Sequence, residues 1–153
     1  MHRRAFGLLL YTGQRSGDVR MMQWTKYKDG GVEVVQSKTK EPPRIPAHRN
    51  LRALLDNVER QHVMMLHTEH GNSFGPVYFG AWFRKEMKRI CVGGLQPHGL
   101  RKNAVCALLE AGCSEAETAA ITGQSIPMVM HYAKKVNQKR LATSAMAKWE
   151  RNT

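Results

Sequence analysis

The sequence predicts a mainly helical α+β domain that contains one small antiparallel β-sheet. Apolar residues recur at helical spacing through most of the chain, and they make up 42% of it, which is enough for a packed core. Short extended segments separated by turn-forming residues occur only near residues 29–46. A length of 153 residues fits a single domain. No apolar run approaches the roughly 18 residues that a membrane-spanning helix needs, so we expect no membrane association of that kind.

Two short helices are predicted first. Residues 5–9 place apolar side chains at helical spacing, and Gly13 marks the end of this helix. Ser16 is expected to be the N-cap of a second helix that runs as far as Met22. Asp18 lies in the first turn of that helix, where a carboxylate interacts favourably with the helix dipole.

A small β-sheet is predicted next. Residues 32–36 and 44–46 form two extended segments on either side of the turn 37–41, and the Asp-Gly-Gly segment 29–31 precedes them. Prolines within and just before the second segment confine it to the edge of the sheet, because proline lacks the N–H that a central strand donates.

Helices are predicted for most of the remaining chain, which shows no internal repeat or low-complexity tract. The Gly-, Asn- and Ser-rich segment 68–76 is expected to be an exposed loop. The predicted helices cover 51–58, 79–90, Pro97 to Gly112, a short helix from a capping box at Ser114 and Glu117 to Gly123, one that starts at Ser125, and a last one from about Asn137.

Positive charge dominates the composition. There are 24 Lys and Arg residues against 12 Asp and Glu, a formal net charge of +12. This excess predicts a polyanionic partner, with nucleic acid first and an anionic membrane surface a distant second. An RNA-binding role would also fit the charge, but the aromatic residues do not cluster into a base-stacking surface. The three cysteines are an odd number without metal-type spacing, which argues against a disulfide framework and fits a reducing cytoplasm or nucleoid.

Two segments could bind a phosphate. His98 and Arg101 lie three residues apart at a predicted helix N-terminus, where free N–H groups and the helix dipole favour an anion. Arg15 lies between two glycines just before a helix start, and a guanidinium can grip a phosphate with two hydrogen bonds. The alternatives are that His98 caps the helix and Arg101 is a solvated surface charge, and that Arg15 forms a surface pair with Asp18.

Lys38, Lys40 and Tyr132 have similar alternatives. The lysines lie on a predicted β-turn, where solvated side chains are the default, and Tyr132 could be an ordinary half-buried helix tyrosine. A tyrosine hydroxyl is a poor nucleophile at its free pKa of about 10, so catalysis would require positive neighbours or a base.

The ordered set of motifs distinguishes these alternatives. The chain resembles the catalytic domain of the tyrosine recombinases, also called phage integrases, over essentially its whole length. Four motifs carry the resemblance in the family's order: Thr-Gly-Gln-Arg-Ser-Gly-Asp at 12–18, Gln-Ser-Lys-Thr-Lys at 36–40, His-Gly-Leu-Arg-Lys at 98–102, and Ile-Thr-Gly-Gln-Ser at 121–125 followed by His-Tyr-Ala-Lys at 131–134. The resemblance implies the tyrosine recombinase catalytic-domain fold.

The resemblance also implies a role for each motif residue. Arg15 and Arg101 match the two arginines that clamp the scissile phosphate, and His98 matches the family's His or Lys before the second arginine. Lys38 matches the lysine of the β-turn that protonates the leaving 5′-oxygen, with Lys40 as the rival for this role. Tyr132 matches the nucleophile that attaches to the DNA 3′-phosphate.

One motif position departs from the family. The glycine of the Gly-His-Ser motif is usually followed by His or Trp, but Gln124 occupies that place here. A glutamine amide can donate a hydrogen bond to a phosphate oxygen but cannot act as a charged donor or an acid.

The resemblance therefore implies a site-specific DNA recombinase that acts through a 3′-phosphotyrosine intermediate and needs no cofactor. The sequence accordingly shows no acidic metal cluster and no P-loop. The expected partners are double-stranded DNA and further copies of the chain, as a tetramer on DNA, with a monomer as the alternative state of the free chain. The alternatives are a type IB topoisomerase-like enzyme, which uses the same chemistry, and a DNA-binding module that does not cleave.

The domain organisation is also expected from the resemblance. Residues 1–153 would form one catalytic domain, a fragment of a longer integrase without its N-terminal core-binding domain. In the family the segment after the tyrosine packs on a neighbouring protomer. Residues 137–153 carry Leu141, Ala145 and Trp149 at helical spacing, an apolar stripe suited to such an exchange. The alternative is that this stripe packs on its own domain.

Overall fold

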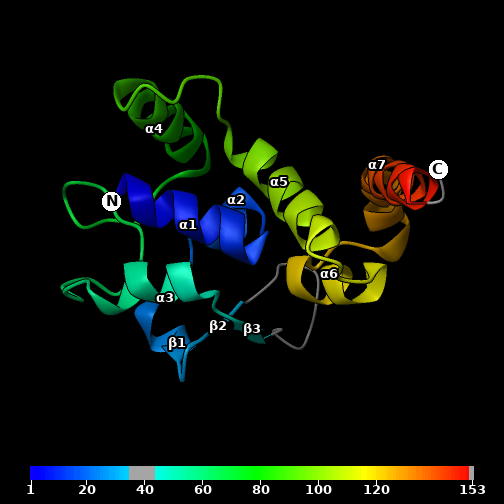
Figure 1. Cartoon of the computed structure of the whole chain (residues 1–153). Coiled ribbons are helices and arrows are strands. Elements are labelled where there is room, and N and C mark those ends of the chain that lie inside the picture. Colours follow the sequence, from blue (N-terminus) through cyan, green and yellow to red (C-terminus); the bar gives the residue numbers. More distant parts are fainter. Residues whose placement is uncertain (35–43, 152–153) are drawn as a thin grey trace. The chain divides into compact units, whose positions relative to one another are not determined.

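The computed structural model describes residues 1–34 and 44–151. It divides into two compact units, Met1–Ala104 and Val105–Thr153, which are described one at a time. The elements are α1 (His2–Thr12), α2 (Ser16–Val19), a 3-10 turn (Trp24–Lys26), β1 (Tyr27–Lys28), β2 (Gly31–Glu33), β3 (Arg44–Pro46), α3 (Arg49–Asp56), α4 (Pro76–Arg89), α5 (Pro97–Glu110), α6 (Glu115–Thr122) and α7 (Ile126–Glu150) (Figure 1). The predicted fold class, mainly helical with a small antiparallel sheet, is confirmed.

Helix α1 lies at the centre of the first unit, between α3 and α4 (Figure 1). Its apolar face buries Leu8 and Leu9 completely, and α3 contributes Leu51 and Leu55 to the same core. Each such side chain stabilises the fold by about 1.5–3 kcal/mol relative to an exposed position. The first unit therefore has a well-packed interior beneath the turn that joins α1 to α2.

Among the described residues, the sheet has three antiparallel strands in the order β1-β2-β3. Strand β3 lies at the edge, as the prolines predicted. Strand β1 was not predicted, because two residues are too short to show an alternating pattern. The predicted turn 37–41 lies outside the described residues.

The second helix differs from its prediction. Ser16 is the first helical residue and Arg15 is the N-cap, and the helix ends at Val19 rather than at Met22. Beyond Val19 the chain turns and pairs with a distant segment, since the Met65 N–H donates to the Met22 carbonyl over 2.9 Å. Tertiary pairing thus overrides the local helical pattern.

The loop before α4 is partly buried, although it was predicted to be exposed. Phe74 lies within the segment expected to be exposed, yet only 1% of it is accessible. Its ring packs against Phe79 and Trp82 of α4, with centroids 5.4 and 4.8 Å away. The burial of one aromatic residue in a segment of mostly polar and turn-forming residues cannot be predicted from the sequence pattern.

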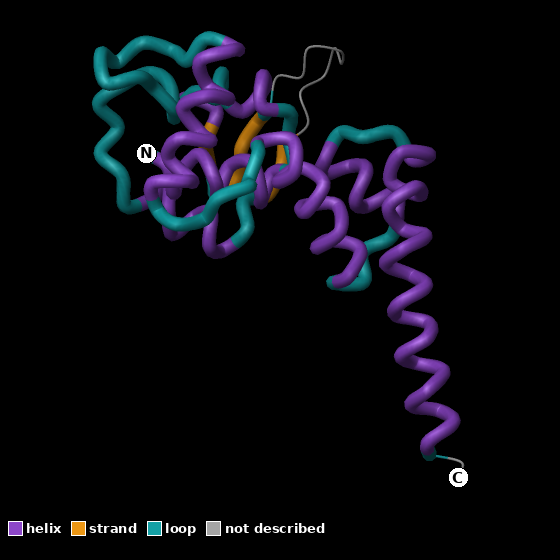
Figure 2. The backbone as a smooth tube through the Cα atoms, turned by 90° about the horizontal axis from the view of Figure 1, so that it is seen from above, coloured by secondary structure: helices purple, strands orange, loops and turns teal. Residues whose placement is uncertain are grey.

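The second unit contains the end of α5 together with α6 and α7. Ser114 and Glu117 form the predicted capping box of α6, and Gly123 ends this helix in the left-handed conformation. The two helices predicted after Ser125 are one continuous helix of 25 residues, α7, whose last part runs on beyond α6 (Figure 2). Asn137 does not interrupt it, because no proline or glycine follows Pro127. In the part of the chain that is described, no helix has the length and apolar character needed to cross a membrane.

Candidate active site

Arg15 lies in the tight turn between α1 and α2. Gly13 ends α1 with φ 62°, a left-handed conformation that glycine adopts without strain, and Arg15 then caps α2 in an extended conformation. The Arg15 carbonyl accepts hydrogen bonds from the N–H groups of Asp18 and Val19, each over 2.9 Å. The backbone that carries the guanidinium is therefore held by the helix that follows it.

The Arg15 side chain remains 44% exposed. Its Nη1 lies 4.0 Å from Oδ2 of Asp18, at the outer limit of an ion pair. The surface pair that the sequence offered as an alternative is thus present but long. A guanidinium has five N–H donors, so this single contact is compatible with binding a phosphate.

Thr12 and Gln14, two polar residues that precede Arg15, are completely buried, and no individual role was predicted for either of them. The Thr12 hydroxyl donates to the Leu8 carbonyl over 2.6 Å, and the Gln14 side-chain amide donates to the Thr12 carbonyl over 3.1 Å. A pattern of residue types gives no direct signal for such a network, because threonine and glutamine are usually exposed at helix ends. The role of Thr12 and Gln14 becomes evident only from their burial in the structure.

His98 and Arg101 lie in the first turn of α5, which begins at Pro97. His98 is exposed, whereas only 7% of Arg101 is accessible. The alternative that Arg101 is a solvated surface charge is therefore wrong. A buried guanidinium requires compensating polar or charged groups, and its position in the first turn of a helix is one where an anion is stabilised.

Gln124 and Tyr132 belong to the second unit. Gln124 follows the left-handed Gly123 at the end of α6 and is half-buried. Tyr132 lies on α7, also half-buried, against a small apolar core of Val105, Leu109, Val129 and Ala133. The His131 ring meets the Tyr132 ring edge to face, with centroids 5.5 Å apart.

The predicted site residues are thus distributed over both units. Arg15, His98 and Arg101 lie in the first, and Gln124 and Tyr132 lie in the second. Lys38 and Lys40 lie outside the described residues. Within the described residues, His, Cys, Asp and Glu side chains form no group of three that could hold a metal ion.

Comparison with known proteins identifies the family. The phage integrase family model matches residues 1–139, and the chain belongs to this family. No curated protein sequence gives a significant match.

Solved structures of tyrosine recombinases share the fold. XerA recombinase is similar with a TM-score of 0.73 and 14% identity over 94% of this chain and 61% of that chain. A lambda integrase dimer bound to a COC′ core site is similar with a TM-score of 0.68 and 26% identity over 86% of this chain and 41% of that chain. The Tn1549 transposon integrase in complex with circular intermediate DNA is similar with a TM-score of 0.70 and 15% identity over 91% of this chain and 58% of that chain. The chain thus has the tyrosine recombinase catalytic-domain fold, and it spans about three fifths or less of the length of these structures.

Proposed function

We propose that this chain is the catalytic domain of a site-specific DNA recombinase that cleaves and rejoins strands through a covalent 3′-phosphotyrosine at Tyr132. The observation that carries the proposal is the extent of the family match, which runs over residues 1–139 and so includes every motif residue. The alternatives of a topoisomerase-like enzyme and of a pure DNA-binding module remain as outcomes of the experiment below.

In the proposed reaction the Tyr132 oxygen attacks the scissile phosphorus and the bond to the 5′-oxygen breaks. The phenolic proton leaves to a base, and Lys38 protonates the departing 5′-oxygen, with Lys40 as its rival. The phosphotyrosine bond conserves the energy of the phosphodiester, so a second 5′-hydroxyl can reverse the step on another strand without a nucleotide cofactor.

Arg15 and Arg101 stabilise the transition state in this proposal. A phosphodiester gains negative charge on its equatorial oxygens during displacement, and preorganised guanidinium donors oppose that charge. His98 and Gln124 add hydrogen bonds to the same phosphate. The burial of Arg101 supports its role, because a rigid donor needs no reorganisation when the charge develops.

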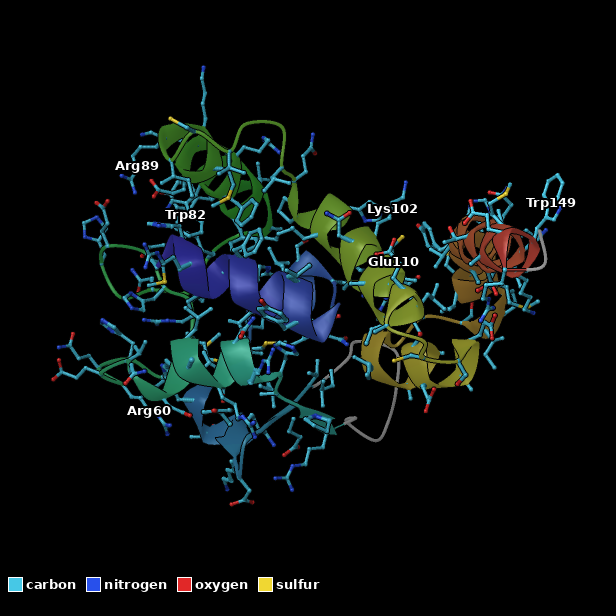
Figure 3. All side chains as sticks on the ribbon, viewed as in Figure 1. Arg60, Trp82, Arg89, Lys102, Glu110 and Trp149 are labelled. Atoms are coloured by element: carbon cyan, nitrogen blue, oxygen red, sulfur yellow. The ribbon has the colours of Figure 1, made fainter. Side chains whose placement is uncertain are left out.

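Double-stranded DNA and identical protomers are the proposed partners. The chain carries a net charge of +12, and the structures with the similar fold include a lambda integrase dimer on a core site. We further propose that residues 1–153 act as one catalytic domain of a longer integrase with a core-binding domain, in the cytoplasm or nucleoid. The end of α7, where Trp149 lies (Figure 3), is the part that we propose is exchanged between protomers. Leu141 and Trp149 expose 64% and 66% of their surface.

Covalent capture on a suicide substrate tests this function. The chain is incubated with a nicked duplex from which cleavage releases a short fragment that carries the free 5′-hydroxyl. This fragment diffuses away, and the products are separated on a denaturing gel. We expect an adduct with the wild-type chain and none with Tyr132→Phe, while the affinity for DNA changes by less than about twofold. Tyr78→Phe is the matched control, because Tyr78 is 57% exposed and lies outside the motifs.

Two outcomes would favour the alternatives. DNA binding without any adduct would support a DNA-binding module. An adduct accompanied by relaxation of supercoiled DNA, with no joining between two duplexes, would support a topoisomerase-like enzyme.

A further inference from the structure

Two segments of the chain, 12–19 and 122–129, adopt the same local structure. Both have Thr, Gly and Gln in their first three positions and Val in the last. One segment joins α1 to α2 in the first unit, and the other joins α6 to α7 in the second. No internal repeat is evident in the sequence, because four shared residues in eight are too few to indicate one without the structure.

The backbone of the two turns agrees closely. Gly13 ends α1 with φ 62° and ψ 17°, and Gly123 ends α6 with φ 63° and ψ 27°. Arg15 is the N-cap of α2 with φ −65° and ψ 147°, and Ser125 is the N-cap of α7 with φ −69° and ψ 148°. Each capping carbonyl accepts the N–H groups three and four residues later, over 2.9 to 3.1 Å.

The two threonines also make the same contact. Thr12 and Thr122 are completely buried, and each hydroxyl donates to the carbonyl four residues earlier, over 2.6 Å to Leu8 and 2.8 Å to Thr118. This contact does not stabilise a helix, because such carbonyls already accept the helical N–H and hydroxyl back-bonding tends to bend helices. Valine would fill the same volume without burying a polar group. Packing alone therefore gives no reason for a hydroxyl at both places.

The first turn indicates what the hydroxyl does. The Thr12 oxygen accepts the backbone N–H of Gln14 over 3.4 Å, and the Gln14 amide returns a hydrogen bond to the Thr12 carbonyl over 3.1 Å. The residue directly before Arg15 is thus tied to the end of α1 through its backbone and its side chain. Rotation of the turn about the flexible Gly13 is restricted, and the direction of the Arg15 backbone is restricted with it.

We propose that Thr12 and Thr122 are matched positioning residues, whose buried hydroxyls hold the two Thr-Gly-Gln turns that present Arg15 and Gln124 to the scissile phosphate. This inference rests on the function proposed above. A displacement of about 1 Å in a catalytic group can cost a factor of about a hundred in rate, so a hydroxyl that fixes such a turn acts on catalysis without touching DNA.

Paired substitutions in the 153-residue chain test the proposal. Thr12→Val and Thr122→Val remove the hydroxyl and keep the volume, whereas Thr12→Ser and Thr122→Ser keep the hydroxyl. The rate of adduct formation is measured in single turnover at saturating suicide substrate, and the Kd for the duplex is measured separately. We expect each valine variant to lose about tenfold or more in rate with its Kd within about twofold, and each serine variant to stay within about threefold of wild type.

Thr118→Val is the matched control. Thr118 lies on α6, is completely buried, and its hydroxyl has no hydrogen-bond partner among the described residues. The same substitution at equal burial should therefore leave the cleavage rate unchanged. Because the two turns lie in different units, the Thr122 pair repeats the test if Thr12→Val does not fold.

A double-substitution cycle separates positioning from a general loss of structure. If Thr122 acts through Gln124, Thr122→Val should cause no further loss of rate in a Gln124→Ala background. Three results would overturn the proposal. The losses from Thr122→Val and Gln124→Ala could be fully additive, the valine variants could cleave like wild type, or the serine variants could be as impaired as the valine variants. The Arg15→Ala variant distinguishes a failure of the proposed function from a failure of the positioning role. Cleavage at the wild-type rate by Arg15→Ala would contradict the proposed function itself. An inactive Arg15→Ala together with a fully active Thr12→Val would contradict only the positioning role.

Discussion

In the proposed reaction, two arginines with different surroundings bind the same phosphate. The Arg15 side chain is 44% exposed in a turn, whereas Arg101 is 7% accessible in the first turn of α5. The sequence placed both near helix starts, but it could not distinguish a buried guanidinium from a solvated one, because burial depends on packing by residues distant along the chain. The motif pattern therefore predicted the identity of the candidate residues, and the structure shows how deeply each one is buried.

The two arginines should behave as one unit in catalysis. Arg15→Ala and Arg101→Ala should each lower the cleavage rate by about a hundredfold or more, as the loss of a transition-state donor does. The double variant should be little slower than the slower single variant, because groups that act together are not additive. Single-turnover cleavage measures all three rates. Strictly multiplicative losses would indicate two separate sites of action.

Tyr27 makes stability depend on alkaline pH. Burial, followed by the hydrogen bond from its hydroxyl to Asp56 over 2.7 Å, raises the pKa of Tyr27 from 10.0 to about 12. The folded state thus favours the neutral phenol, and this stabilisation is complete below pH 10 and is lost as the pH rises through about 12. Denaturant unfolding of wild type and Tyr27→Phe should differ at pH 8 by about 1–2 kcal/mol, and the difference should shrink above pH 10. A constant difference would show that Tyr27 does not titrate in this way.

Helix boundaries show where local signals suffice. The capping box at Ser114 and the glycines at 13 and 123 were predicted correctly, because a cap depends on residues within one turn. The length of α2 was wrong, since pairing of Met22 with Met65 ends it. The division of α7 into two helices was also wrong, because asparagine weakens a helix without breaking it.

The end of α7 should be dispensable for folding and required for assembly. The side chains described between residues 141 and 150 are exposed, and the core of the second unit uses Val129 and Ala133 instead. Deletion of residues 137–153 should shift the thermal midpoint by only a few degrees and leave DNA binding intact. The truncated chain should fail to assemble with other protomers on DNA in analytical ultracentrifugation. Unfolding of the truncated chain would show that the apolar stripe serves its own domain.

Charge acts at the scale of the whole molecule. Most of the Lys and Arg residues lie in the first unit, so the excess positive charge is concentrated there. Each phosphate that a protein neutralises steepens the log–log dependence of affinity on salt by about 0.9. We expect this chain to bind duplex DNA with a Kd of about 10⁻⁴ to 10⁻⁶ M at physiological salt and with a steep salt dependence. Affinity that is independent of salt, measured by fluorescence anisotropy, would contradict a phosphate-binding surface.

At this scale the sequence predicted the fold class and the family but not the division of the chain. Helical periodicity and the motif order extend over both units, so no break in the helical pattern marks the boundary after Ala104, which lies inside α5. The repeated turn was missed for a related reason. Its equivalence lies in backbone angles and buried hydroxyls, which four shared residues do not reveal.

The proposed reaction attaches Tyr132 covalently to DNA. The chain has four tyrosines, so the adduct trapped on a suicide substrate can be digested and the modified peptide mapped by mass spectrometry. We predict a single modification, a nucleotide linked through its 3′-phosphate to the oxygen of Tyr132 in the His-Tyr-Ala-Lys segment. Attachment to another tyrosine, or to a residue of any other type, would contradict the proposed mechanism.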